Sequence, residues 1–169
     1  ILRRDSRPDL WRDLMAGISE ANDEGADILG QVLTRPTGIL LGFEISMNPF
    51  LGRPSWEAIA KLPLAEKLVH LRDPAFRQRV MSETCPEEKL RKRVSTFERI
   101  FPWDGDVPDY EPPAEQSIAA RASREGRDPE EIVYDVLLER EGRRILYRPL
   151  SNYAYGSLDT VGDMLRHPN

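Results

Sequence analysis

Hydrophobic residues recur at helical spacing near the start of the chain and predict a helix over residues 7–24. The positions that share its apolar face are Leu10, Trp11, Leu14, Met15, Ile18 and Ala21. Pro8 suits the first turn, where its missing N–H costs no hydrogen bond. Gly25 can end the helix in a left-handed conformation.

A short apolar run follows over residues 26–34 and stops before Pro36. Its length and its bounding glycine and proline favour a buried strand over a helix. A helix, a glycine and a short strand in this order are typical of an α/β fold. We therefore expect residues 1–34 to contribute one helix and one strand.

Residues 35–96 are expected to form a mostly helical insertion. The apolar stretch 39–51 is interrupted by glycine and proline and predicts a packed loop or a short strand. Short amphipathic helices are predicted after it, including one opened by Asp73 and one that starts near Thr84. The insertion is long for a plain connection between two elements. In enzymes with an α/β fold, insertions of this kind usually cover the active face.

Residues 97–169 are expected to supply a late strand with helices around it. Ser117 is predicted to cap one helix, and Asp128 opens the next. Residues 145–147 form a predicted strand, and Ser157 is predicted to cap the last helix. The expected fold class is therefore α/β.

Charge and composition narrow the class of protein. The chain has 169 residues and a net charge of -5, with both signs interspersed, so no basic face is available for nucleic acid or an anionic membrane. No apolar run has membrane-spanning length. A single cysteine cannot form an internal disulfide and fits a reducing compartment, so we expect a cytoplasmic protein without nucleic-acid or membrane partners.

The residue types that usually carry chemistry are sparse and scattered. His70 and His167 suit helix surfaces or helix ends better than a metal site, which needs more ligands nearby. Cys85 precedes Pro86 at a predicted helix start, but no histidine is indicated as its partner, so an inert thiol is favoured. The acidic run within residues 104–115 is broken by prolines, which favours a solvated loop over a calcium site. We expect no catalytic residue and no metal ligand in this chain.

The last part of the chain carries a recognisable pattern. Residues 145–169 read ILYRPLSNYAYGSLDTVGDMLRHPN, and residues 117–142 read SIAARASREGRDPEEIVYDVLLEREG. Together with LPLAEKLVHLRDPAFRQRV at residues 62–80, they resemble a family of metal-dependent amidohydrolases. The family includes the D-aminoacylases, also called N-acyl-D-amino-acid deacylases. The similarity covers residues 55–84 and 117–169 and is weak in the first fifty.

The resemblance implies a fold. Members of this family form a (β/α)8 TIM barrel, with a small β-sandwich built from the two chain ends. Residues 26–34 would be barrel strand six and residues 144–149 strand seven. The chain would then be an internal segment of a barrel with a helical insertion, and its ends at Ile1 and Asn169 look like cut points in a longer polypeptide.

The resemblance also implies a reaction. The family hydrolyses a C–N amide bond with a water that zinc activates. Its zinc ligands and its proton-shuttling aspartate would lie outside this segment, so we expect zinc in the full-length protein and none here. Where the family reads Asp-x-Tyr-Pro-Tyr after strand six, residues 30–36 read GQVLTRP, so the D-amino-acid pocket is expected to differ.

Active sites of such barrels lie at the C-terminal ends of the strands, which would place Arg35, Asn152 and Tyr153 at the rim. Arg35 is the candidate for binding a substrate carboxylate. Asn152 and Tyr153 either contact the substrate or simply build the turn. The expected partners are a small-molecule amide, the rest of the barrel and a second copy associating through open sheet edges. The alternative is a non-catalytic α/β module used for packing or interaction.

Overall fold

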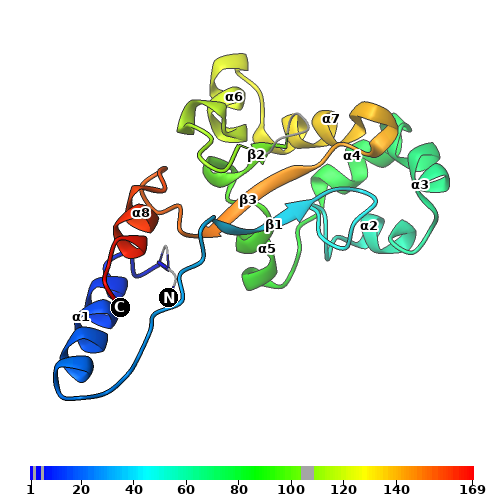
Figure 1. The fold of residues 1–169 in the computed structure, drawn as a ribbon. Helices are drawn as coiled ribbons and strands as arrows, with labels where there is room; N and C mark the ends of the chain where they lie inside the picture. The colour runs from blue at the N-terminus through cyan, green and yellow to red at the C-terminus, as the bar shows by residue number, and fades with distance from the viewer. Residues whose placement is uncertain (2, 5, 104–108) are drawn as a thin grey trace. The chain divides into compact units, whose positions relative to one another are not determined.

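Figure 1 shows the computed structural model of the chain, which describes residues 1, 3, 4, 6–103 and 109–169. It is a mixed α/β protein with far more helix than strand. Residue contacts divide it into two compact units, which are described separately. Unit 1 comprises Ile1–Gly38, Asp109–Pro112 and Pro149–Asn169, and unit 2 comprises Ile39–Pro108 and Pro113–Arg148.

The helices of unit 1 are α1 (Leu10–Asp23) and α8 (Asp159–Leu165). The helix predicted for residues 7–24 is therefore present as α1, and Gly25 lies just past its end at a φ of 99°. The side chains that form the small core of unit 1 are Trp11, Met15, Val161 and Met164. A spacing of three or four residues puts each pair on one face of its helix, which is the face that packs.

The strand predicted for residues 26–34 is wrong, since this stretch has neither helix nor strand. Its backbone bonds to a side chain instead of a neighbouring strand: the Asn22 amide donates to the Ile28 oxygen and accepts from the Ile28 N–H, both at 2.8 Å. Leu29 is 79% exposed, so the apolar run is not buried as a strand would require. An apolar run makes a strand only where a partner strand supplies the ladder.

Among the described residues, three strands form one sheet in the order β1-β3-β2. They are β1 (Thr37–Leu41), β2 (Phe101–Pro102) and β3 (Leu146–Ser151). β2 pairs antiparallel with β3, with Phe101 opposite Tyr147. The sheet is antiparallel, whereas neighbouring strands of a (β/α)8 barrel run parallel. The α/β class is confirmed at this level, and the barrel segment is not confirmed.

The helices of unit 2 occupy the predicted insertion and the stretch after it. They are α2 (Pro54–Ile59), α3 (Leu64–Leu71), α4 (Pro74–Ser82), α5 (Glu88–Val94), α6 (Ile118–Glu125) and α7 (Pro129–Gly142), with short 3-10 turns η1 (Phe97–Arg99) and η2 (Ala114–Gln116). The side chains of Asp73, Ser117 and Asp128 each accept a hydrogen bond from a backbone N–H in the first turn of a helix. These residues therefore cap the helices that the sequence predicted they would open.

The core of unit 2 is aromatic at its centre. The ring of Phe43 contacts those of Phe50, Trp56 and Tyr134, and the Phe50 ring contacts that of Tyr134, with centroids 5.3 to 6.2 Å apart. The Tyr134 hydroxyl donates to the Leu71 oxygen at 2.8 Å, which satisfies its buried polar atom. Burial of this hydroxyl raises the pKa of Tyr134 to about 12.

Candidate functional site

The turn after β3 centres on Asn152, which is fully buried and has a φ of 61°. Asparagine tolerates this left-handed conformation better than most residues with a side chain. The turn leads the chain from β3 towards α8. All the contacts described for this site lie within unit 1.

The Asn152 side chain ties together three segments that are distant in the sequence. Its Oδ1 accepts from the Arg3 N–H at 2.7 Å. Its Nδ2 donates to the Leu33 oxygen at 3.0 Å and to the Arg35 oxygen at 3.2 Å. Because a side-chain amide has only two N–H donors, none remains to bind a substrate. The geometry therefore gives Asn152 the task of building the turn and holding the backbone of Arg35.

Tyr153 is buried, with 6% of its surface exposed. Its hydroxyl donates to the Pro112 oxygen. This bond fixes the orientation of the ring and attaches the segment Asp109–Pro112 to the turn, so Tyr153 has a structural role in the turn.

Arg35 differs from the two turn residues because its side chain is exposed. Its guanidinium lies over the ring of Tyr110, 5.8 Å from the centroid. Among the described residues, no carboxylate lies within ion-pair distance of Arg35. The structure thus brings Arg35, Asn152 and Tyr153 into one region of unit 1, and only Arg35 presents hydrogen-bond donors to solvent.

Sequence reasoning missed two residues of this region, Tyr110 and Glu111. The Glu111 carboxylate accepts from the Leu158 N–H at 2.6 Å. Leu158 is the N-cap residue of α8, so Glu111 ties a distant segment to the start of this helix. The predicted cap Ser157 lies one residue before Leu158, and its hydroxyl accepts from the Asp159 N–H at 3.4 Å. Both missed residues fall in the stretch that the sequence analysis interpreted as a solvated loop. The one sequence signal for a structural role there was an acidic residue next to an aromatic one.

Sequence reasoning also missed Arg3, because no local sequence signal marks it as a functional residue. It is fully buried, and its Nη1 donates to the Thr160 hydroxyl at 2.6 Å. Its guanidinium lies 4.7 Å from the centroid of the Tyr155 ring. Arg3 therefore links the start of the chain to α8 through its side chain and to the turn at Asn152 through its backbone N–H.

His167 and Ser19 form the pair in unit 1 that most resembles a nucleophile with its base. The Ser19 oxygen lies 3.2 Å from Nε2 of His167. The Asn169 N–H donates to Nδ1 at 3.2 Å, so the neutral ring carries its proton on Nε2 and donates to Ser19. A serine nucleophile needs a histidine that accepts its proton, so this pair joins α1 to the chain just after α8 and does not activate the serine.

Cys85 is equally structural. It is 3% exposed and its thiol donates weakly to the Glu87 oxygen at 3.6 Å. The sulfur packs against Gly52, where an added Cβ would lie 2.5 Å from it. A thiol enclosed in this way has no access to a substrate.

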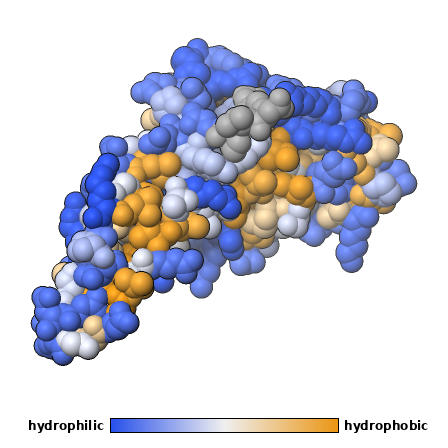
Figure 2. All heavy atoms as spheres, viewed as in Figure 1, coloured by the Kyte–Doolittle hydropathy of each residue, from blue (hydrophilic) through white to orange (hydrophobic). Residues whose placement is uncertain are grey.

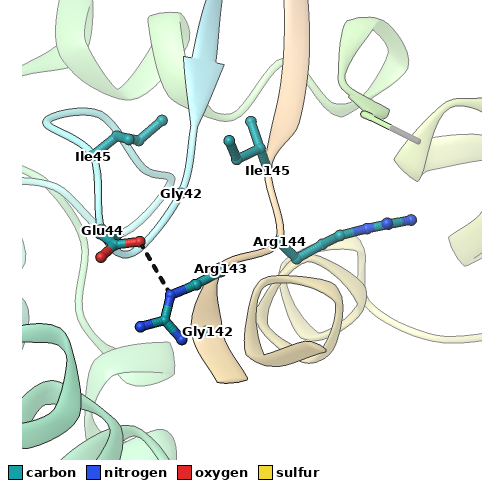
Figure 3. A pocket seen from close by; sticks show the side chains of 7 residues that line it. All are labelled: Gly42, Glu44, Ile45, Gly142, Arg143, Arg144 and Ile145. Carbon is teal, nitrogen blue, oxygen red and sulfur yellow. Dashed lines mark ion pairs between the residues drawn. The ribbon is translucent and has the colours of Figure 1, made fainter. Parts of the chain in front are cut away.

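Unit 2 contains a small pocket near the start of β3, shown in Figure 3. Its volume is about 30 Å³, enough for one or two waters and too small for an acyl amino acid. Glu44 and Arg143 face each other across it, 3.7 Å apart. The pocket is therefore not a candidate substrate site.

The described residues contain no group of three or more His, Cys, Asp or Glu side chains that could hold a metal ion. None of their helices combines the length and the hydrophobicity needed to cross a membrane.

Comparisons with protein-family models, with curated proteins and with solved structures returned no match to this chain.

Proposed function

We propose that this chain is part of a zinc-dependent amidohydrolase that hydrolyses the C–N amide bond of an N-acyl amino acid. The observation that supports this proposal is the order of elements in residues 145–169, the stretch that resembles the deacylases. It folds as a strand, a sharp turn and a helix: β3, the turn at Asn152 and α8. This is the order that the family resemblance implies for the approach to its last barrel strand.

Arg35 is the residue of this chain that we propose contacts the substrate. The Asn152 side chain donates to the backbone oxygen of Arg35, so the backbone that carries the Arg35 side chain is held in place. A guanidinium offers a planar fork of N–H donors that matches the two oxygens of a carboxylate. The carboxylate of an N-acyl amino acid fits this fork, while the amide to be cleaved would lie towards the rest of the site.

Asn152 and Tyr153 act through Arg35 in this proposal. Their own polar groups are bonded to the backbone of unit 1, so they position the rim of the site. Their effect on a substrate would be indirect, through the placement of Arg35 and of the turn.

Zinc would have to be held by residues other than the described ones. No described group of His, Cys, Asp or Glu fits a metal site, and the resemblance places the ligands on other strands of the polypeptide.

The proposal is tested with the full-length polypeptide and a panel of N-acyl amino acids of both configurations. We expect release of the free amino acid, loss of the activity after treatment with a chelator and recovery when zinc is added. Absence of hydrolysis across the panel, with the folded protein verified by circular dichroism, would favour the alternative of a packing or interaction module.

A further inference from the structure

The apolar residues of α1 lie in two stripes along the helix. Trp11 and Met15 belong to the stripe that packs in the core of unit 1. The second stripe, here called the outer face of α1, precedes the first by one residue and consists of Leu10, Leu14, Gly17 and Ala21. One residue turns a helix by about 100°, so the outer face lies to the side of the contact with this core.

The outer face is open to solvent at its middle. Leu14 is 46% exposed, and a Cβ added at Gly17 would meet no heavy atom within 4 Å. Leu10 and Ala21 at its two ends are half-buried. The helix surface therefore presents a projecting leucine next to a hollow at the glycine.

The outer face is complementary to itself when two copies of α1 run antiparallel. Its residues are spaced by four, three and four, which is the spacing of helices that pair side by side. An antiparallel copy that places Leu14 opposite the partner's Gly17 also places Leu10 opposite the partner's Ala21. Each large side chain then meets a small one, so the two helices can approach closely and fill both hollows.

The distribution of charge favours the antiparallel orientation over the parallel one. The exposed acidic residues at the end of α1 and just after it are Glu20, Asp23, Glu24 and Asp27. At the start of the helix, the exposed arginines Arg4, Arg7 and Arg12 offset the acidic residues around them. A parallel pair would bring the two acidic ends together, whereas an antiparallel pair brings each acidic end near the arginines of the other copy.

We propose that the outer face of α1 is a docking surface for a second copy of this chain, bound antiparallel. A pair of 14-residue helices buries less surface than the roughly 800 Å² per partner of a stable dimer. The pair is therefore weak and forms at high protein concentration. It is independent of the proposed reaction, because neither Arg35 nor the turn at Asn152 belongs to the outer face.

Two variants of the 169-residue chain, Leu10→Cys and Ala21→Cys, test the pairing by disulfide cross-linking. In the antiparallel pair, position 10 lies opposite the partner's position 21, while two copies of the same position are about 16 Å apart along the axis, too far for a disulfide. The two variants, mixed and oxidised, should form the mixed disulfide. Either variant alone should stay at the level of the wild-type chain, whose Cys85 is 3% exposed.

Gly17→Gln, added to both cysteine variants, separates pairing from folding. The new side chain enters open space in the single chain, and glutamine favours a helix more than glycine does, so the stability should rise. In the pair it occupies the hollow that takes the partner's Leu14, so the yield of mixed disulfide should fall about tenfold. Ala16→Gln, exposed on α1 beside the outer face, is the matched control and should leave the yield unchanged.

A change of charge should strengthen the pair. Asp13 borders the outer face and lies across the antiparallel pair from the partner's Glu20, so these like charges oppose association. Asp13→Arg replaces the repulsion by an attraction and should raise the yield of mixed disulfide about threefold.

Three results would overturn the proposal, with circular dichroism used to verify that each variant keeps its helices. The first is a mixture of the two cysteine variants that forms no mixed disulfide. The second is a disulfide that either variant forms alone as fast as the mixture does, which a parallel or unspecific contact would give. The third is a yield that Gly17→Gln leaves unchanged.

Discussion

Asn152 joins the start of the chain, the stretch before β1 and the turn after β3 through one side chain. Its partners lie up to 149 residues away in the sequence. The sequence predicted a turn at Asn152, because asparagine is favoured in turns. It could not predict which segments the amide would hold, because those contacts depend on the path of the whole chain.

Asn152→Ala is expected to lower the free energy of unfolding by about 3 kcal/mol. The change leaves the Leu33 and Arg35 oxygens and the Arg3 N–H without their partner, and it keeps a side chain at positive φ. Urea denaturation measures the loss. Asn152→Gly relaxes the backbone alone and should recover about 1 kcal/mol. A wild-type stability in Asn152→Ala would contradict the structural role.

Under the proposed function, Arg35→Ala is expected to lower kcat/KM of the full-length polypeptide for N-acyl amino acids about tenfold, the value of a hydrogen bond to a charged group. The kcat/KM of Arg35→Lys should lie between those of the wild-type protein and Arg35→Ala, since lysine keeps the positive charge but lacks the two parallel N–H donors of a guanidinium. Arg12→Ala, an exposed arginine of α1, is the matched control. An unchanged kcat/KM in Arg35→Ala would remove Arg35 from the site.

Tyr134 gives unit 2 a measurable dependence on pH. Its pKa is about 12 in the folded chain and 10.0 when unperturbed, so its contribution is complete below pH 10 and is lost as the pH rises towards 12. The stability advantage of the wild-type chain over Tyr134→Phe should therefore shrink by about 1.4 kcal/mol at pH 11. Urea unfolding of both proteins from pH 8 to 11 tests this, and a constant difference would contradict it.

At the scale of elements, local signals predicted helices better than strands. Asp73, Ser117 and Asp128 cap helices as expected, because a cap bonds to N–H groups two or three residues away. The stretch 26–34 had an apolar pattern and no local partner, and it forms no strand. Strand formation depends on a neighbour that the pattern of one stretch does not reveal.

The start of α2 is sensitive to the residue at position 52. Gly52 has a φ of 77°, and an added Cβ would lie 2.5 Å from the Cys85 sulfur. We expect Gly52→Ala to cost about 2 to 3 kcal/mol, from backbone strain and from the overlap.

The contact between Gly52 and Cys85 can be measured separately from the backbone strain. Cys85→Ala removes the sulfur, so the double variant should lose less stability than the sum of the two single losses. Unfolding free energies of the four proteins give the comparison. Strictly additive losses would mean that the sulfur is not the obstacle.

At the scale of the whole chain, the barrel segment inferred from resemblance is the part that sequence could not establish. The described sheet is small and antiparallel, and α/β is the level at which prediction and structure agree. Arg35, Asn152 and Tyr153 lie in one unit, and their place at the rim of a barrel site stays a prediction. Tyr110 and Glu111 join them only through folding of a distant segment.

Unit 1 has a small core and leaves large apolar side chains on its surface, where Figure 2 shows hydrophobic atoms. Leu29 is 79% exposed and Leu165 is 54% exposed. Exposed apolar surface of this kind favours association, so the 169-residue chain expressed alone should self-associate as its concentration rises.

Sedimentation velocity over a range of concentrations measures this association. The double change Leu29→Ser and Leu165→Ser should weaken it. Val69→Ser serves as the control, because Val69 is 73% exposed but belongs to unit 2. A chain that stays monomeric at all concentrations would contradict the expectation.

The segment Asp109–Pro112 belongs to unit 1, while the chain on both sides of it belongs to unit 2. Unit 1 is consequently assembled from three pieces, and the last of them begins at Pro149. Because synthesis runs from the N-terminus, all of unit 2 leaves the ribosome before Asn152 and Thr160 do, so its residues can pack first. The first 38 residues must wait, with Trp11 and Met15 uncovered, until α8 emerges.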